Sequence, residues 1–215
     1  MKILAFTTSD NSISVALISN KKLIAKNNID ESGRQAELTV LEIEKILTQN
    51  KIWYNDLDLI STTNGPGSFT GTRIALTCAR TIKISTNIPL VLLNSCEVIA
   101  YKYRKISDNI FVLIDAKADE FFYSQNQSQP KLAKLEDLSK IFPKKSFFLC
   151  GSGKKNAAEI LQKENLEFVT NEEKDEIEAD LVGFLALKKF QKQKISSQNL
   201  NPIYLREPKI SARKK

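Results

Sequence analysis

One order of apolar stretches occurs twice along this sequence, and it limits the fold more than any other feature. In each half, three strand-like stretches are followed by helix, strand, helix, strand and helix, judged from apolar periodicity and intervening turn residues. A meander followed by alternating helices and strands predicts a mixed sheet with helices packed on it, because parallel strands need crossover connections. Two copies of this order predict a duplicated domain.

The expected elements follow from the residue pattern. The first half is predicted to contain strands Ile3–Thr8, Ile13–Ser19, Leu23–Ile29, Leu57–Thr62 and Pro89–Leu93, and helices Gln35–Gln49, Phe69–Thr86 and Ser95–Arg104. The second half is predicted to contain strands Ile110–Asp115, Glu120–Gln125, Lys131–Lys134, Ser146–Cys150 and Leu166–Thr170, and helices Leu135–Ile141, Asn156–Glu164 and Ala179–Gln193. The polar stretch 101–107 is the expected junction, so residues 1–104 form the first domain and residues 105–215 the second.

This fold class is α/β: an actin-like ATPase fold, built from two RNase H-like domains that are each a mixed sheet with packed helices. The sequence contains no histidine, which excludes Ser-His-Asp triads, Cys-His dyads and H-E-x-x-H zinc sites. Cys78, Cys96 and Cys150 are far apart and form no C-x-x-C pair. We therefore expect buried, reduced thiols in a cytoplasmic protein.

The formal net charge of +7 has two explanations. It can mark a surface that meets nucleic-acid phosphates, or a solvated lysine surface spread along the chain. We favour the second, with the tail Lys209 to Lys215 as a minor nucleic-acid candidate. No stretch approaches the ~20 consecutive apolar residues of a membrane-spanning helix, and the first residues have the pattern of a strand, not of a signal peptide. No membrane association is expected.

Three of the seven glycines fall in one loop between a predicted strand and a predicted helix. Glycine allows positive φ and close backbone approach, and a helix N-terminus favours an anion. The loop therefore either faces a phosphate or a partner, or is a tight turn whose Ser68 or Thr70 caps the helix. It matches neither a Walker A nor a Rossmann motif. The residues of this loop motif are Gly65, Pro66, Gly67, Ser68, Phe69, Thr70 and Gly71, with Arg73 shortly after.

Two weaker candidate sites lie in the second half. Asp115, Asp119 and Glu120 cluster at a strand end, where carboxylates can hold Mg²⁺. Acidic residues in a β-turn usually face water or bond nearby backbone, so we prefer a turn, and no metal site is predicted. Gly151-Ser152-Gly153 is the second-half counterpart of the first glycine loop. In actin-like ATPases a glycine pair there touches adenosine, but a simple turn explains it equally well.

The fuller segment Asn64–Ile74 is similar to the motif G-P-G-S-F-T-G-x-R-I of the TsaB (YeaZ) family. The opening Ile3–Thr8, the segment Asp115–Phe121 and the segment Pro202–Arg206 also resemble this family, the last two through its motifs D-A-R-x-x-E and P-x-Y-L-R. The resemblance covers nearly the whole chain.

This resemblance implies a scaffold without catalytic residues of its own. It implies that the chain binds a TsaD-type catalytic subunit as a heterodimer and supports threonylcarbamoyl transfer to the adenosine next to the tRNA anticodon. A TsaE-type ATPase is the second implied partner, tRNA is met through the complex, and the chain alone is expected to form a homodimer. No intrinsic cofactor is expected, and any nucleotide site is expected only in the complex with partners.

The chain also departs from the family pattern. Thr7 stands where members commonly carry Asp, Lys117 where they carry Arg, and Arg34–Glu37 replaces a segment like R-x-H-S-E. Threonine cannot supply the acid that active actin-like ATPases use near the metal and phosphates. The alternative function is nonetheless an actin-like ATPase or phosphotransferase that is active on its own. A third alternative, a general RNA-binding module, rests on charge alone.

The expected docking surface for the TsaD-type subunit is formed by the two helices Gln35–Gln49 and Phe69–Thr86. Burial of apolar surface would drive this association, at ~25 cal/mol per Å² before association costs are subtracted. The residues expected to point outward and bind the partner are Leu38, Thr39, Glu42, Ile74, Thr77 and Cys78.

Overall fold

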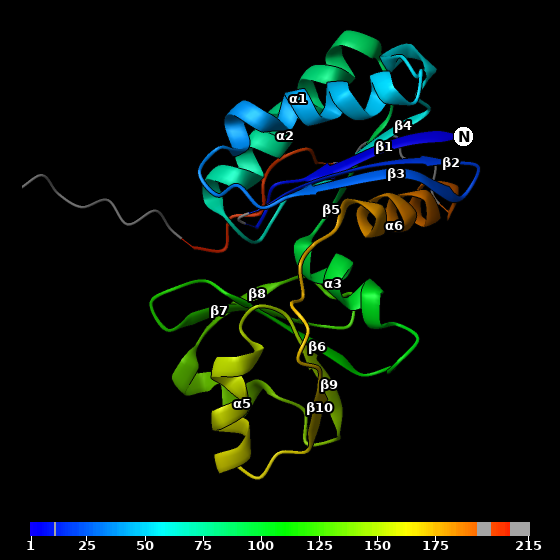
Figure 1. Ribbon diagram of the computed structural model, residues 1–215. Coiled ribbons are helices and arrows are strands. Elements are labelled where there is room, and N and C mark those ends of the chain that lie inside the picture. The colour runs from blue at the N-terminus through cyan, green and yellow to red at the C-terminus, as the bar shows by residue number, and fades with distance from the viewer. Residues whose placement is uncertain (11, 193–198, 207–215) are drawn as a thin grey trace, which may run out of the picture.

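The computed structural model describes residues 1–10, 12–192 and 199–206, and it contains two five-stranded mixed sheets with helices packed on them (Figure 1). The first sheet has the order β3-β2-β1-β4-β5 and the second the order β10-β9-β6-β7-β8. In both, the first three strands are antiparallel and the last two run parallel to the first. The two halves therefore share one topology, and the predicted duplicated fold is confirmed.

The elements have the following bounds. The first half contains β1 (Lys2–Thr7), β2 (Ile13–Ser19), β3 (Lys22–Ile29), α1 (Gln35–Gln49), the 3-10 helix η1 (Tyr54–Asp56), β4 (Leu59–Thr63), α2 (Phe69–Thr86), β5 (Leu90–Leu93) and α3 (Ser95–Tyr103). The second contains β6 (Ile110–Asp115), β7 (Glu120–Gln125), β8 (Lys131–Lys134), the 3-10 helix η2 (Leu135–Asp137), α4 (Leu138–Ile141), β9 (Phe147–Cys150), α5 (Lys154–Lys163), β10 (Phe168–Thr170) and α6 (Ala179–Lys192).

The predicted elements all occur in the predicted order, although the predicted helix Leu135–Ile141 is divided into η2 and α4. The other described bounds differ from prediction by no more than two residues. The short helix η1 was not predicted. It explains why β4 begins at Leu59, because the N–H of Leu57 bonds to the carbonyl of Tyr54 and closes this 3-10 turn. Within the described residues, no helix has both the length and the apolar composition needed to cross a bilayer.

The last helix of each half packs against the sheet of the other half. Helix α6 lies on β1 and β2 of the first sheet, whereas α3 lies on β6 and β7 of the second, and the two helices also contact each other. Figure 1 shows α6 beneath the first sheet, on the face opposite to α1 and α2. One continuous apolar core therefore combines both sheets with α3 and α6. Two smaller cores fill the outer faces, one beneath α1 and α2 and one beside α4 and α5.

This exchange differs from the expected division of the chain. The boundary between residues 104 and 105 does separate the strands of the two sheets. Residues 179–192, however, lie in space with the first sheet, and α3 lies with the second. The physical reason is that each sheet has one apolar face that its own half leaves uncovered, and the helix from the other half buries it.

A hydrogen bond and two ion pairs to the first sheet hold the beginning of α6 in place. The N–H of Ala179 donates to Oγ of Ser14, 2.8 Å away, and so one of the unpaired N–H groups of the helix start is satisfied by the first sheet. Lys26 on β3 pairs with Glu178 at 2.5 Å and with Asp180 at 3.3 Å. These contacts fix where α6 enters the first half.

Close packing of α6 on the sheet requires a glycine at position 183. A Cβ atom there would lie 2.4 Å from Cδ1 of Ile18 and 3.1 Å from Cβ of Ala5. We expect Gly183→Leu to lower the free energy of unfolding by about 3 kcal/mol, since overpacking forces neighbours out of their rotamers. Urea unfolding measures this loss. Gln191→Leu adds similar bulk at an exposed position of α6 and should change stability little; equal losses in the two variants would contradict this packing.

Candidate functional site

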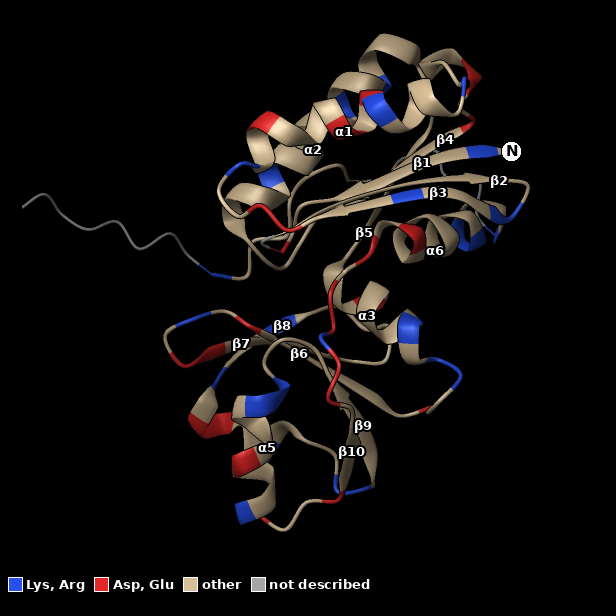
Figure 2. Cartoon of the chain, viewed as in Figure 1, with Lys and Arg blue, Asp and Glu red and all other residues tan. Residues whose placement is uncertain are grey.

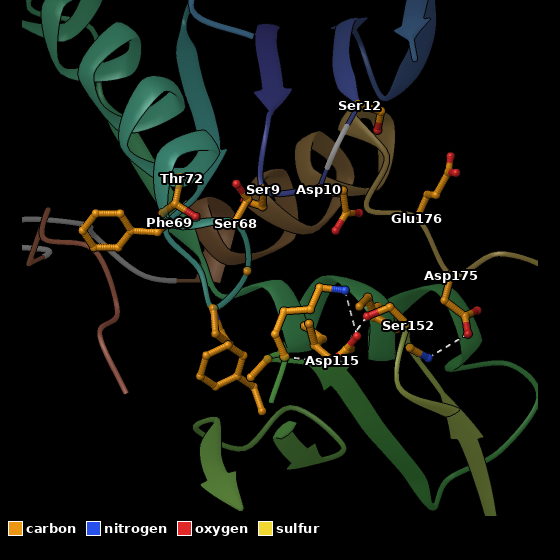
Figure 3. Close-up of a pocket in the computed structure, with 18 of the residues that line it drawn as sticks. Ser9, Asp10, Ser12, Ser68, Phe69, Thr72, Asp115, Ser152, Asp175 and Glu176 are labelled. Carbon is orange, nitrogen blue, oxygen red and sulfur yellow. Dashed lines mark hydrogen bonds and ion pairs between the residues drawn. The ribbon is translucent and has the colours of Figure 1, made fainter. Parts of the chain in front are cut away.

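A cleft of about 1080 Å³ lies between the two halves. It is lined by the loops that follow β1, β4, β6 and β9, together with residues 172–176 and 203–206. Figure 3 shows side chains from both halves facing one another across it. Ligand sites of open α/β sheets lie at the carboxyl ends of strands, so this cleft is the candidate site of the fold.

The glycines of the first loop are required by close backbone contacts. A Cβ atom on Gly71 would lie 1.8 Å from the carbonyl oxygen of Thr8, and one on Gly67 would lie 2.7 Å from that of Ser9. The N–H of Ser68 donates to the Ser9 carbonyl at 2.8 Å, and Oγ of Ser68 accepts from the N–H of Gly71 at 3.2 Å as the cap of α2. Of the two sequence interpretations, these contacts support the tight capped turn.

Three hydroxyl groups occupy the end of β1, where an acid is commonly found in the family that the motifs resemble. Oγ1 of Thr7 lies 2.6 Å from Oγ1 of Thr63, which in turn lies 2.5 Å from Oγ of Ser9. All three side chains are buried, with Thr7 only 2% exposed. The hydroxyls satisfy one another, and this cluster contains no charged group that could hold a cation.

Asp10 follows this cluster and faces the segment that leads into α6. Its Oδ2 accepts the N–H of Ile177 at 3.1 Å. Desolvation by the surrounding loops raises the pKa of the Asp10 carboxyl; the hydrogen bond from Ile177 opposes this, and the nearby charge of Glu176 raises the pKa further. Asp10 was not singled out from the sequence, because its position in a turn gave no sign of its desolvation.

Residues 199–206, the C-terminal strap, lie along the glycine loop and reach the second half. The N–H of Ile203 donates to the carbonyl of Asn64 at 2.8 Å, and Nδ2 of Asn64 donates to the carbonyl of Asn201 at 3.2 Å. Further along, Nε of Arg73 donates to the hydroxyl of Tyr204 at 2.8 Å. The strap thus closes over the start of α2.

The end of the strap joins the second half. Arg206 forms an ion pair with Glu120 and donates to the carbonyl of Ala116 at 3.1 Å. The motif at residues 202–206 therefore contacts both of the other motifs, those around residues 65–74 and 115–121, although all three are far apart along the chain.

The acidic turn after β6 has local partners. Asp115 accepts from the backbone N–H of Lys117 at 2.7 Å and from its Nζ at 2.9 Å. Burial alone would raise the pKa of Asp115, but these hydrogen bonds and the lysine charge outweigh it and hold the pKa below the usual value. Glu120 pairs with Arg206, as described, and Asp119 is exposed. The hydrogen bonds between Asp115 and Lys117 support a turn at this point of the chain.

The second glycine loop is also a tight turn. Gly151 has φ +103°, and a Cβ atom there would lie 2.2 Å from the carbonyl oxygen of Leu113. Lys154, at the start of α5, is buried and donates to Asp175 at 2.8 Å; Asp175 also accepts the N–H of Gly151 at 2.7 Å. The charge of Lys154 is thus neutralised within the wall of the cleft. Sequence reasoning missed Lys154, because it placed the helix start two residues later.

Comparison with known proteins identifies the family. A family model described as TsaD, tRNA N6-adenosine threonylcarbamoyltransferase, matches residues 32–209, so the chain belongs to the family of that model. The tRNA threonylcarbamoyladenosine biosynthesis protein TsaB of Buchnera aphidicola (subsp. Schizaphis graminum) is 29% identical over 77% of this chain and 84% of its own length. The structure of YeaZ from Pseudomonas aeruginosa aligns with a TM-score of 0.76 at 20% identity, over 95% of this chain and 99% of that one.

Within that match, the chain belongs to the TsaB (YeaZ) family. This is a family of tRNA threonylcarbamoyladenosine biosynthesis. A ROK family protein from Streptococcus pneumoniae aligns with a TM-score of 0.55 at 10% identity, over 90% of this chain and all of that one. That likeness concerns the fold alone, and it agrees with the actin-like architecture predicted from the sequence.

The six residues expected at a partner surface differ in how far their side chains are exposed to solvent. Thr77 is exposed, and Leu38, Ile74 and Cys78 are half-buried. Thr39 and Glu42 do not point outward as expected: both are buried, where Thr39 donates to the carbonyl of Gln35 and Glu42 accepts from Nδ2 of Asn27 at 3.1 Å. Polar side chains satisfied by nearby groups face inward, and helical periodicity alone cannot reveal this.

The apolar side chains exposed on these helices are different ones. Val40 and Leu41 on α1 are 48% and 56% exposed, and Ile84 near the end of α2 is 83% exposed. Of the other sequence expectations, Cys96 and Cys150 are buried and Cys78 is half-buried, all three as free thiols. Figure 2 shows Lys and Arg spread over both halves of the described chain. The basic tail lies outside the described residues.

The TsaB-family glycine loop can be tested at Gly71. Within a helix, replacing glycine by alanine ordinarily stabilises a protein. Here Gly71→Ala should instead lower the free energy of unfolding by about 3 kcal/mol, because the new methyl group meets the Thr8 carbonyl. Thr70→Ala, at the exposed neighbouring position, should have little effect. Urea unfolding measures both, and a stabilised Gly71→Ala would contradict the contact.

The raised pKa of Asp10 has a consequence for stability. A carboxyl that is harder to ionise in the folded state costs stability once the pH exceeds its unfolded pKa of roughly 4. Asp10→Asn keeps an oxygen for the Ile177 N–H but removes the charge. The variant should therefore gain stability relative to the parent as the pH rises from about 4 to 7. Denaturant unfolding at several pH values measures this difference, and a difference independent of pH would contradict it.

Proposed function

We propose that this chain is a non-catalytic scaffold subunit that binds a TsaD-type catalytic subunit and so supports threonylcarbamoyl transfer to the adenosine next to the tRNA anticodon. Membership of the TsaB family supports the pathway. The observation that carries the scaffold role is an exposed apolar surface on α1, centred on Val40 and Leu41.

The docking face is formed by α1 and α2, which lie side by side over the first sheet (Figure 1). Their inner sides contribute to a closed core with Ile43, Ile46 and Leu76, so their outer sides remain for another protein. Exposed aliphatic side chains on adjacent helices suit association with a second pair of helices by interdigitation of side chains. The same face would serve a homodimer when the partner is absent.

The chemistry of the cleft supports a role without catalysis. The Thr7, Ser9 and Thr63 hydroxyls bond to one another at the position where an ATPase of this fold needs a carboxylate. The chain has no histidine to act as a general base or metal ligand. Lys154, a cation at a helix start in the cleft, is neutralised by Asp175. These features favour the scaffold over an independently active ATPase.

In this proposal the chain acts by holding its partner in a working conformation. The core that joins both halves through α3 and α6 supports the sheet on which α1 and α2 are presented. A TsaE-type ATPase would recognise the resulting heterodimer, and nucleotide would bind only in that complex. Catalytic groups would come from the TsaD-type subunit.

The docking face predicts the effect of one charged substitution. Leu41→Glu places a carboxylate within the proposed interface, where desolvating it without a partner is costly. We expect at least a tenfold loss of affinity for the TsaD-type subunit, measured by calorimetric titration, and a matching loss of tRNA modification in the reconstituted system. Stability of the monomeric chain, measured at a dilution where it does not self-associate, should change by less than about 0.5 kcal/mol, because Leu41 is exposed in the monomer.

Val169→Glu is the matched control, since Val169 is 59% exposed on β10 in the other half. It should leave partner binding and modification unchanged. Undiminished binding of the TsaD-type subunit by Leu41→Glu would overturn the proposal. Threonylcarbamoyl transfer or steady ATP hydrolysis by the purified chain alone would also overturn it.

A further inference from the structure

Two aromatic rings and one guanidinium group form an exposed cluster where the strap crosses the start of α2. The rings of Phe69 and Tyr204 have centroids 5.5 Å apart, and Cζ of Arg73 lies 4.0 Å from the centroid of Phe69. Phe69 remains 55% exposed and Tyr204 50% exposed. This Phe69–Arg73–Tyr204 cluster lies at the edge of the cleft, and Figure 3 shows the Phe69 ring directed away from Asp10 and Asp115.

The exposure of these rings is not explained by the fold of the chain. The glycines of the same loop are needed for its turn, and Ser68 is needed for the cap, but Phe69 contributes to none of the three apolar cores. A small polar residue at position 69 would leave the turn and the start of α2 intact. Large aromatic side chains held half in water mark surfaces that bind another molecule.

The charge at the cluster indicates what kind of molecule fits. No carboxylate among the described residues forms an ion pair with Arg73, in contrast to Lys117, Lys154 and Arg206, which all have acidic partners around the cleft. An unneutralised arginine beside exposed rings suits a ligand that combines a flat π-system with negative charge, which is the chemistry of a nucleotide in RNA.

We propose that the Phe69–Arg73–Tyr204 cluster binds single-stranded RNA directly, with an unpaired base stacked on Phe69 and a phosphate held by Arg73. This inference rests on the proposed function only in taking tRNA as the natural RNA. It assigns the chain its own RNA contact, in addition to the contacts made through its partners. The unpaired loop of a tRNA anticodon arm presents both required groups.

The hydrogen bond from Arg73 to Tyr204 gives the cluster a structural role, which the experiment must separate from RNA binding. It fixes the strap and would persist without any RNA. Tyr204→Phe removes this bond but keeps the ring, whereas Phe69→Leu keeps apolar volume but removes a π-face. Stacking therefore predicts that RNA affinity falls in Phe69→Leu and is largely kept in Tyr204→Phe. If the cluster had only a structural role, Tyr204→Phe would lower stability more than Phe69→Leu. Neither variant would then change RNA affinity.

The test is fluorescence anisotropy with a labelled anticodon stem–loop RNA, using the full chain alone and the complex with the TsaD-type subunit. Phe69→Leu should weaken binding roughly 5- to 100-fold, the range expected for the loss of one base stack. Arg73→Gln should weaken binding and reduce its dependence on salt concentration. Val169→Ala, a change at a similarly exposed apolar position on β10 of the second half, should leave RNA affinity unchanged.

Three results would overturn the inference. The first is equal RNA affinity for the parent and Phe69→Leu, both alone and in the complex, including the absence of measurable binding by either. The second is equal binding of a fully paired RNA duplex, which would indicate backbone attraction only. The third is loss of affinity for the TsaD-type subunit in Phe69→Leu without loss of RNA binding, which would make the cluster a protein contact. Leu41→Glu should not alter RNA binding by the isolated chain, so this test and that of the scaffold role can fail separately.

Discussion

The exchange of α3 and α6 between the two sheets is the contact on which the rest of the structure depends. Each helix covers an apolar sheet face that belongs to the other half, and the result is one continuous core. Separating the halves would expose both faces at a cost of roughly 25 cal/mol for each Å² of apolar surface. The loops on either side of the cleft therefore keep fixed positions relative to each other. That fixed spacing allows the strap to contact the glycine loop and the turn after β6 at the same time.

The residues of the glycine loop divide into two groups by their contacts. Gly67 and Gly71 are small because carbonyl groups of Thr8 and Ser9 occupy the space of a side chain. Phe69 and Arg73, by contrast, face outward and interact with Tyr204 of the strap. The same short segment thus contains the glycines that its turn requires and the side chains that the turn exposes. A motif of this kind indicates fold and binding together.

Much of the fold could be predicted from sequence because it depends on local periodicity, and even the short strand Lys131–Lys134 was found in this way. The motif loop and its cap were predictable for the same reason. Contacts between distant segments were not. Nothing local to α6 shows that it covers the first sheet, and nothing near Tyr204 shows that its ring lies against Phe69. The inward orientation of Thr39 and Glu42 also depends on hydrogen bonds that apolar patterning does not report.

The hydroxyl cluster at the end of β1 makes an acidic side chain at position 7 unfavourable. Thr7, Thr63 and Ser9 form a neutral, self-satisfied group that needs neither a counter-ion nor water. An aspartate introduced at position 7 alone would be a buried anion with hydroxyl neighbours and no cation, which is costly to desolvate. A metal site built there would require several changes at once, each unfavourable without the others. The packing around position 7 therefore favours a neutral side chain there.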